Sequence, residues 1–113
     1  MKFIQSSEAV LYKNSDVCDA ITYQLHEKKI SIALIKLRGR YPSKGHATNR
    51  ICNELVYVIR GKGKLGIGKR VVFFAKGDVI IIEKGEKYYW EGKCSLLMPC
   101  YPAFSAAQHK IGN

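Results

Sequence analysis

Residues 54 to 61 read Glu54-Leu55-Val56-Tyr57-Val58-Ile59-Arg60-Gly61, a short apolar run that ends at a glycine. The centre of this run consists of β-branched and aromatic residues, which favour strands over helices. The apolar part, Leu55–Ile59, has the length of a strand and is too short for a buried helix. It therefore predicts a strand covered on both faces, followed by a turn at Gly61.

Similar runs repeat along the rest of the chain, with glycines between them. The predicted strands are Val17–Leu25, Ile30–Leu37, Leu55–Ile59, Lys64–Ile67, Val71–Ala75, Val79–Ile82, Lys87–Trp90 and Ser95–Cys100. Strands at this spacing, with turn signals between them, are typical of β-sandwiches and β-barrels. The single segment that suggests a helical turn is Phe104–Lys110. The fold class predicted is therefore all-β.

The length and composition predict one globular domain, residues 1–113. The chain has 113 residues, of which 47% are apolar and 25% are charged, so it can bury one core. No apolar run approaches the roughly 18 residues of a membrane-spanning helix. Because Met1–Gln5 lacks the apolar run of a secretion signal, we expect a cytoplasmic protein.

The four cysteines, Cys18, Cys52, Cys94 and Cys100, contain no closely spaced pair. Structural zinc sites are usually built from such pairs, so a cysteine zinc site is not expected. Without a secretion signal, disulfides are not expected either. We therefore interpret all four as reduced thiols that serve as small core residues.

The formal net charge of +10 leaves three interpretations open. The basic residues fall mostly at predicted turns and do not cluster, which favours a solvated lysine-rich surface. A positive pocket rim that attracts an anionic small molecule is the second interpretation. Nucleic-acid binding is the third, and the lack of a basic cluster makes it the least favoured.

Around the first run the sequence resembles the first motif of the cupin superfamily. In that family a histidine pair precedes a glutamate, six further residues and a glycine, the spacing found here from Glu54 to Gly61. His46 falls where the first histidine of the pair belongs. The residues between Glu54 and Gly61 are also similar to the strand that follows the ligand loop in cupins.

A second stretch, Gly77–Gly92, resembles the other cupin motif. Gly77 and Gly85 fall at the glycine positions of that motif, and the fifteen residues between Gly61 and Gly77 suit a short cupin. The resemblance covers about residues 30–109. It implies a cupin-type β-barrel, or double-sheet jelly roll, with a pocket inside it.

The sequence departs from the family at the metal ligands. Cupins typically hold one divalent metal through three histidines and one glutamate. In this chain Thr48 stands in register for the second histidine, and a slip of one or two residues would offer Asn49 or Arg50 instead. Tyr88 replaces the third histidine.

The resemblance thus leaves His46 and Glu54 as an incomplete set of metal ligands. Imidazole and carboxylate ligands suit iron, manganese, nickel or zinc. Two ligands rarely hold a metal tightly, so a pocket without metal is the favoured alternative. We expect His46, Glu54 and Tyr88 to converge on the pocket despite their separation in sequence.

The function predicted is that of a small single-domain cupin that binds a small anionic or sugar-like ligand in the barrel. Thr48, Tyr57 and Trp90 are the candidate wall residues. The alternative is an enzyme similar to the metal-free sugar-nucleotide epimerases of the family, with His46 as base and Tyr88 as acid. A weakly metal-dependent enzyme that uses His46 and Glu54 is also open.

A third hypothesis is an interaction module without chemistry. Small cupins are often dimers, so the resemblance implies a homodimer. A strand near Met1–Gln5 is a candidate for pairing across the interface, because exposed sheet edges invite such pairing.

Overall fold

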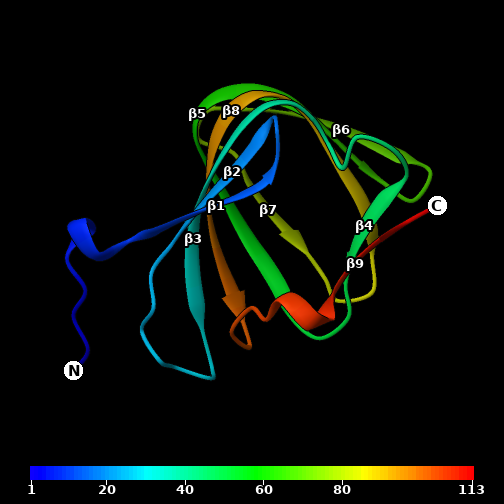
Figure 1. Ribbon diagram of the computed structural model, residues 1–113. Helices are drawn as coiled ribbons and strands as arrows, with labels where there is room; N and C mark the ends of the chain where they lie inside the picture. Colours follow the sequence, from blue (N-terminus) through cyan, green and yellow to red (C-terminus); the bar gives the residue numbers. More distant parts are fainter.

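The computed structural model describes residues 1–113, and nearly all of its regular secondary structure is β-strand (Figure 1). The strands are β1 (Val10–Ser15), β2 (Cys18–Thr22), β3 (Ser31–Tyr41), β4 (His46–Asn49), β5 (Asn53–Ile67), β6 (Arg70–Ala75), β7 (Val79–Ile82), β8 (Lys87–Tyr101) and β9 (His109–Gly112). The only helical segments are two 3₁₀ turns, η1 (Ser6–Glu8) and η2 (Ala106–Gln108). The predicted all-β class is therefore confirmed.

All nine strands belong to one antiparallel sheet with β8 near its centre. Strands β3 and β4 pair with one edge of β8, and β5 pairs with the other edge. Strands β2 and β1 extend the sheet beyond β3, and β9 extends it beyond β4. The free edge of β5 pairs with β7 and β6 in turn. The sheet curls, so that β3, β5 and β8 arch over a common interior (Figure 1).

Glycine on three adjacent strands allows their backbones to approach closely within this curled sheet. Gly92 on β8 is the cross-strand partner of both Gly39 and Gly63. A Cβ atom on Gly92 would lie 2.6 Å from the Cα atom of Gly63, and one on Gly63 would clash with the carbonyl oxygen of Glu91. Side chains at these positions would push β5 and β8 apart.

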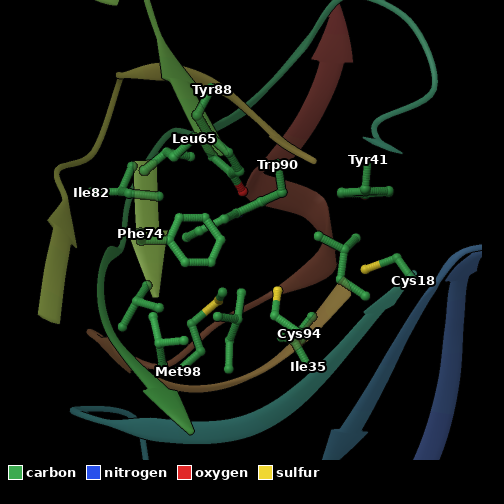
Figure 2. Packing of buried hydrophobic residues seen from close by; sticks show 14 of the residues in the cluster. Cys18, Ile35, Tyr41, Leu65, Phe74, Ile82, Tyr88, Trp90, Cys94 and Met98 are labelled. Carbon is green, nitrogen blue, oxygen red and sulfur yellow. The ribbon is translucent and has the colours of Figure 1, made fainter. Parts of the chain in front are cut away.

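The inward faces of the strands form one apolar core (Figure 2). Val56, Val58, Leu65 and Leu96 are completely buried in it. Its largest ring, Trp90, packs edge-on against Phe74, with ring centroids 5.4 Å apart. The side chains of this core fill the interior that the sequence suggested would be a pocket.

Several predicted strands need correction because glycine does not end them. Leu55–Ile59 and Lys64–Ile67 are parts of one strand, β5, which continues through Gly61 and Gly63. The last two predicted strands, likewise, are parts of one strand, β8, which continues through Gly92. In a curled sheet glycine permits a bend or bulge, and the ladder of hydrogen bonds continues past it.

The ends of the chain also differ from the prediction. Met1–Gln5 forms no strand, and Lys2 Nζ instead donates a hydrogen bond to the carbonyl oxygen of His26 at 2.8 Å. The predicted helical turn Phe104–Lys110 shrinks to η2, because the chain extends from His109 to pair with β4. All four cysteines are buried and free. The structure contains no helix long and apolar enough to cross a membrane.

Candidate functional site

The apolar interior is interrupted at one place by a connected group of polar side chains. Asn49, Glu54 and Gln108 are the only buried polar or charged residues of the chain, each at most 5% exposed. Five further residues join them by hydrogen bonds. The polar cluster consists of Tyr41, Asn49, Cys52, Glu54, Tyr88, Cys100, Gln108 and His109.

Asn49, the last residue of β4, is the centre of the polar cluster. Its Nδ2 donates to Glu54 Oε1 at 2.8 Å and to the Tyr88 hydroxyl at 3.3 Å. Its Oδ1 accepts from Gln108 Nε2 at 3.3 Å and is 2.8 Å from His109 Nδ1. A single amide therefore connects residues from β5, β8, η2 and β9.

This arrangement fixes the proton on the His109 ring. Asn49 Oδ1 can only accept, so Nδ1 of His109 must carry the proton. The unprotonated Nε2 then accepts a hydrogen bond from the Tyr41 hydroxyl at 3.0 Å. Burial lowers the pKa of His109 and raises the pKa of Tyr41 to about 12, so both stay neutral at pH 7.

Glu54, at the start of β5, is the titratable group of the polar cluster that responds near neutral pH. Burial raises the pKa of its carboxyl to about 7, although hydrogen bonds from Tyr88, Cys100 and Asn49 act in the opposite direction. Burial also raises the pKa of Tyr88 well above its usual value, and the Glu54 charge adds to this effect. A carboxyl that titrates near pH 7 beside a protonated phenol can take up or release a proton under physiological conditions.

Two thiols lie next to Glu54. Cys100 Sγ is 3.7 Å from Glu54 Oε2, and a hydrogen bond from Cys100 lowers the pKa of the Cys52 thiol. The pKa of Cys100 is raised, chiefly by the same bond to Cys52. Gln108 Nε2 donates to Cys52 Sγ at 3.3 Å, and Gln108 Oε1 accepts from the Cys52 backbone at 3.2 Å. These bonds attach the C-terminal segment to the end of the barrel.

The structure brings together part of the predicted site. Glu54 and Tyr88 both point inward and meet through Asn49. Trp90 lies two residues further along β8, and its ring centroid is 6.5 Å from that of Tyr88 (Figure 2). These three predicted residues share one side of the interior.

The other predicted residues, His46, Thr48 and Tyr57, lie on the outer face of the sheet. Residues alternate along β4, and its buried residues are Ala47 and Asn49, so His46 and Thr48 point outward. On β5, Tyr57 points outward and is 45% exposed. The expected convergence of His46 with Glu54 and Tyr88 is therefore corrected, and Asn49 occupies the corresponding inner position.

His46 lies instead in a basic outer hollow. Its ring packs against the edge of Tyr89 at a centroid distance of 5.8 Å, and the Arg40 guanidinium covers the Tyr89 ring at 4.1 Å. A shallow hollow of about 200 Å³ beside His46 is lined by Thr48, Lys87, Lys110 and the C-terminal residues 111–113. His46 has no carboxylate partner there.

The inner residues do not fit the metal centre that the family resemblance implies. No three His, Cys, Asp or Glu side chains lie close enough together to hold an ion. The only histidine of the polar cluster, His109, has both ring nitrogens occupied by Asn49 and Tyr41. Glu54 faces an amide, a phenol and a thiol, which are poor ligands for iron, manganese, nickel or zinc when protonated.

Sequence reasoning missed Tyr41, Cys100, Gln108 and His109 as members of this group, and it named Asn49 only as an alternative to Thr48. For Asn49 a signal existed: if 46–49 had been predicted as a strand, alternation from Ala47 would have turned Asn49 inward. His109 and Gln108 carry no local signal. They reach the polar cluster only because the C-terminal segment returns to pair with β4.

A second hollow opens at the free edge of the sheet. This edge is formed by β6 and β7, which pair with successive parts of β5. It has a volume of about 200 Å³ and is mostly apolar. Its lining residues are Leu65, Ile67, Arg70, Val72, Ile80, Ile81 and Glu86. Leu65 also belongs to the core beside Tyr88, and Ile67 is the cross-strand partner of Tyr88 (Figure 2).

No family model and no curated protein matches this chain. Solved structures match its fold. Pac13, a nucleoside dehydratase, has a TM-score of 0.88 at 15% identity, with coverage of 100% of this chain and 92% of Pac13. KdgF from Halomonas sp. has a TM-score of 0.75 at 12% identity, with coverage of 95% and 98%. Ectoine synthase from P. lautus has a TM-score of 0.75 at 14% identity, with coverage of 100% and 91%.

At these identities the likeness shows the fold alone. It confirms the predicted architecture, a small cupin-like β-barrel, because the matched structures are cupin-like barrels that cover nearly the whole chain. Pac13 from Streptomyces has also been solved with uridine. What these proteins bind or catalyse is a property of each of them.

Proposed function

We propose that this protein binds a small, hydroxyl-rich ligand in the cupin-like barrel, beside Glu54 and Tyr88, in a space that opens when the core side chains around these two residues move. The observation that carries the proposal is that every buried polar or charged residue of the chain belongs to the polar cluster. An apolar core of the same shape would be at least as stable, because buried polar groups recover little more than their own desolvation cost. A function in ligand recognition explains why the polar groups are there.

The ligand would approach from the hollow at the free edge of the sheet, because its lining residue Leu65 belongs to the same core as Tyr88. Leu65, Ile67 and Ile80 form an apolar wall that suits one face of a planar ring. Arg70 at its rim forms no ion pair and is available to an anionic group on the ligand. At about 200 Å³ the hollow admits only a small ligand or one part of a larger one.

In this proposal the residues have distinct roles. Glu54 accepts a hydrogen bond from a ligand hydroxyl, and Tyr88, held by Asn49, donates or accepts one. Trp90 forms the wall behind Tyr88. His46, Thr48 and Tyr57, which lie on the outer face, have no role in this pocket. The likeness to Pac13, solved with uridine, makes uridine the first ligand to test.

The test uses the single tryptophan of the chain as a reporter. Trp90 is buried and packs on Tyr88, so a ligand that reaches the polar cluster should change its fluorescence. Uridine, uridine monophosphate and glucose would be titrated into wild-type protein, Glu54→Gln, Tyr88→Phe and the outer-face control His46→Ala. We expect saturable binding in the wild type and the control, weakened about tenfold in the two inner variants.

Two results would contradict the proposal. One is the absence of any saturable change in fluorescence or melting temperature with all three compounds. The other is a ligand whose affinity is the same in Glu54→Gln as in the wild type. In either case the polar cluster would serve only to attach the C-terminal segment to the barrel.

A second candidate function is proton-transfer catalysis at the same place, favoured by the pKa of about 7 of Glu54. A base with this pKa, next to a protonated phenol, is matched to chemistry at neutral pH. If Glu54 is the base, exchange of an acidic carbon-bound hydrogen of a bound ligand with D₂O should increase as pH rises through about 7. NMR would follow the exchange, and an unchanged rate in Glu54→Gln would exclude this role.

A further inference from the structure

The basic outer hollow beside His46 is built on a row of cross-strand partners. Thr48 on β4 pairs with Lys87 on β8 and with Lys110 on β9. Cross-strand partners project from the same side of a sheet with their Cβ atoms about 5 Å apart. The two lysines therefore flank Thr48, one on each side, and all three side chains line the hollow of about 200 Å³.

One wall of the basic outer hollow is held in place by packing and hydrogen bonds. His46 lines the hollow and meets the edge of the Tyr89 ring at a centroid distance of 5.8 Å. The Tyr89 ring lies directly on the backbone of Gly66, where a Cβ atom would overlap it. The Arg40 guanidinium covers the same ring at 4.1 Å and donates to two backbone carbonyl oxygens at 2.6 and 3.2 Å. An ordered, positively charged group therefore borders the hollow.

The positive charges of the basic outer hollow are not balanced by acidic side chains. None of the ion pairs in the structure includes Lys87, Lys110 or His46. The acidic residues that flank this part of β8 are engaged elsewhere. The Glu86 carboxylate accepts a hydrogen bond from a backbone amide of its own turn at 2.8 Å, and Glu91 is paired with a lysine of β5 at 3.5 Å. Two like charges held beside one hydroxyl repel each other, and an anion between them removes that repulsion.

We propose that the basic outer hollow binds the phosphoryl group of a small anion, with Lys87, Lys110 and Thr48 as donors. A phosphoryl group presents several acceptor oxygens in different directions, so it can accept from both ammonium groups and from the hydroxyl together. A flat carboxylate offers only two oxygens in one plane. The His46 imidazole at the side of the hollow can donate one further hydrogen bond.

The dimensions of the hollow favour a single phosphoryl group over a nucleic-acid backbone. Nucleic-acid binders place basic side chains along a groove that follows successive phosphates. Here the two lysines lie only about 10 Å apart across β4, and the other lining residues of β9 are uncharged. The hollow therefore matches a small anion better than a polymer.

The basic outer hollow lies behind the polar cluster, on the opposite face of the sheet. Each of its three donors is the chain neighbour of a cluster residue: Lys87 of Tyr88, Thr48 of Asn49, and Lys110 of His109. Strand β9 pairs only with β4. A phosphoryl group that bridges the two lysines would therefore connect β8 to β9 and hold the C-terminal strand on the barrel. We expect binding to raise the melting temperature, because a ligand of the folded state stabilises that state.

The experiment titrates the wild-type protein with inorganic phosphate and pyrophosphate at constant ionic strength, set with sodium chloride. It records the melting temperature and the backbone amide NMR signals of Thr48 and Lys110. We expect saturable changes in both, with a dissociation constant below about 1 mM. Lys87→Ala and Lys110→Ala should each weaken binding about tenfold, because each removes one charge-assisted hydrogen bond. Ribose 5-phosphate should shift the same amide signals, and ribose should leave them unchanged.

The matched control is Lys36→Ala, which removes the same charge from an exposed lysine of β3 outside the hollow. It should bind phosphate as the wild type does, and so should Tyr88→Phe, whose side chain lies on the inner face. The proposal would be overturned by a wild type without saturable binding, or by equal weakening in Lys36→Ala and Lys110→Ala. Weakening in Tyr88→Phe would place the anion inside the barrel instead. A short oligothymidylate that binds where phosphate and pyrophosphate do not would identify nucleic acid as the ligand and also overturn the proposal.

Discussion

The inner and outer faces of β5 each carry one exception to the usual distribution of side chains. Glu54 points into the core and is 5% exposed, whereas Tyr57 points to solvent and is 45% exposed. A strand with one wet face normally places its charged residues outside and its aromatic residues inside. Residues on neighbouring strands extend both exceptions, so neither is confined to a single side chain.

The inner exception is a network and the outer exception is a patch. Inside, Asn49 on β4 connects residues from four other segments of the chain through directional hydrogen bonds. Outside, Leu34 and Leu97 continue a row that needs only shape and apolar area. A polar network is sensitive to the loss of one atom, whereas an apolar row is sensitive to an added charge. The following changes test this difference.

The largest effect is expected at the centre of the inner network. Asn49→Leu removes an amide with four partners and leaves the buried Glu54 and Gln108 and the partly buried His109 without it. Each unpaired group costs about 1–3 kcal/mol, so we expect unfolding in urea to be easier by roughly 3 kcal/mol or more. Thr48→Val, next to it on the outer face, should change stability by no more than about 0.5 kcal/mol. Equal losses in the two variants would mean that the network adds nothing to stability.

The second effect is a dependence of stability on pH that is due to Glu54. Its pKa is raised from 4.5 to about 7 by burial, so the folded state holds this proton more tightly than the unfolded state. Glu54 therefore stabilises the fold fully at pH values below 4.5, and this contribution is lost as pH rises to about 7 and above.

The measurement compares the wild type with Glu54→Gln by urea unfolding at pH 5 and pH 8. Relative to the variant, the wild type should lose roughly 2–3 kcal/mol between these values, since one pKa unit corresponds to about 1.4 kcal/mol. Asp19, whose pKa is lowered by Arg38 on the outer face, gives no such loss. A pH-independent difference between wild type and Glu54→Gln would contradict the raised pKa.

The sequence predicted the fold better than the site for a physical reason. Strand texture and glycine spacing are local, and they were sufficient for β6 and β7, which match the predicted runs closely. Glu54 and Tyr88 were also found, because their offsets from glycines define the motifs. Neither strand texture nor glycine spacing shows which face of the sheet a side chain occupies when its strand was not predicted.

That limit explains the error at β4. No strand was predicted over residues 46–49, so nothing indicated that His46 and Asn49 face opposite ways. A shift of one residue along a strand moves a side chain from one face of the sheet to the other. His109 could not be predicted at all, because its position depends on long-range pairing of β9 with β4.

A smaller effect is expected from Tyr88→Phe, which removes one hydroxyl from the inner network. The phenol lowers the pKa of Glu54, so its loss should raise that pKa above about 7. Stability should fall by about 1 kcal/mol, the usual contribution of one hydrogen bond. NMR titration of the Glu54 carboxyl measures the pKa directly. Tyr89→Phe, the next residue and on the outer face, should leave the titration unchanged, and a matching shift there would contradict the assignment.

The smallest effect on stability is expected from replacing His46 on β4. Its counterpart for comparison is His109 on the neighbouring strand β9. His46 has an edge contact with Tyr89 on the outer face, so His46→Ala should cost no more than about 0.5 kcal/mol. His109 is different, because burial lowers its pKa and the neutral ring bonds to Asn49 and Tyr41. Its contribution is complete above its unfolded pKa near 6.5 and is lost as pH falls through the lower folded value. His109→Phe should therefore remove a loss of stability at acid pH that His46→Ala leaves in place, and urea unfolding at pH 5 and pH 7 distinguishes them. If His46→Ala removed it instead, the outer histidine would be the one coupled to the inner network, and the assignment of the two faces of β4 would be wrong.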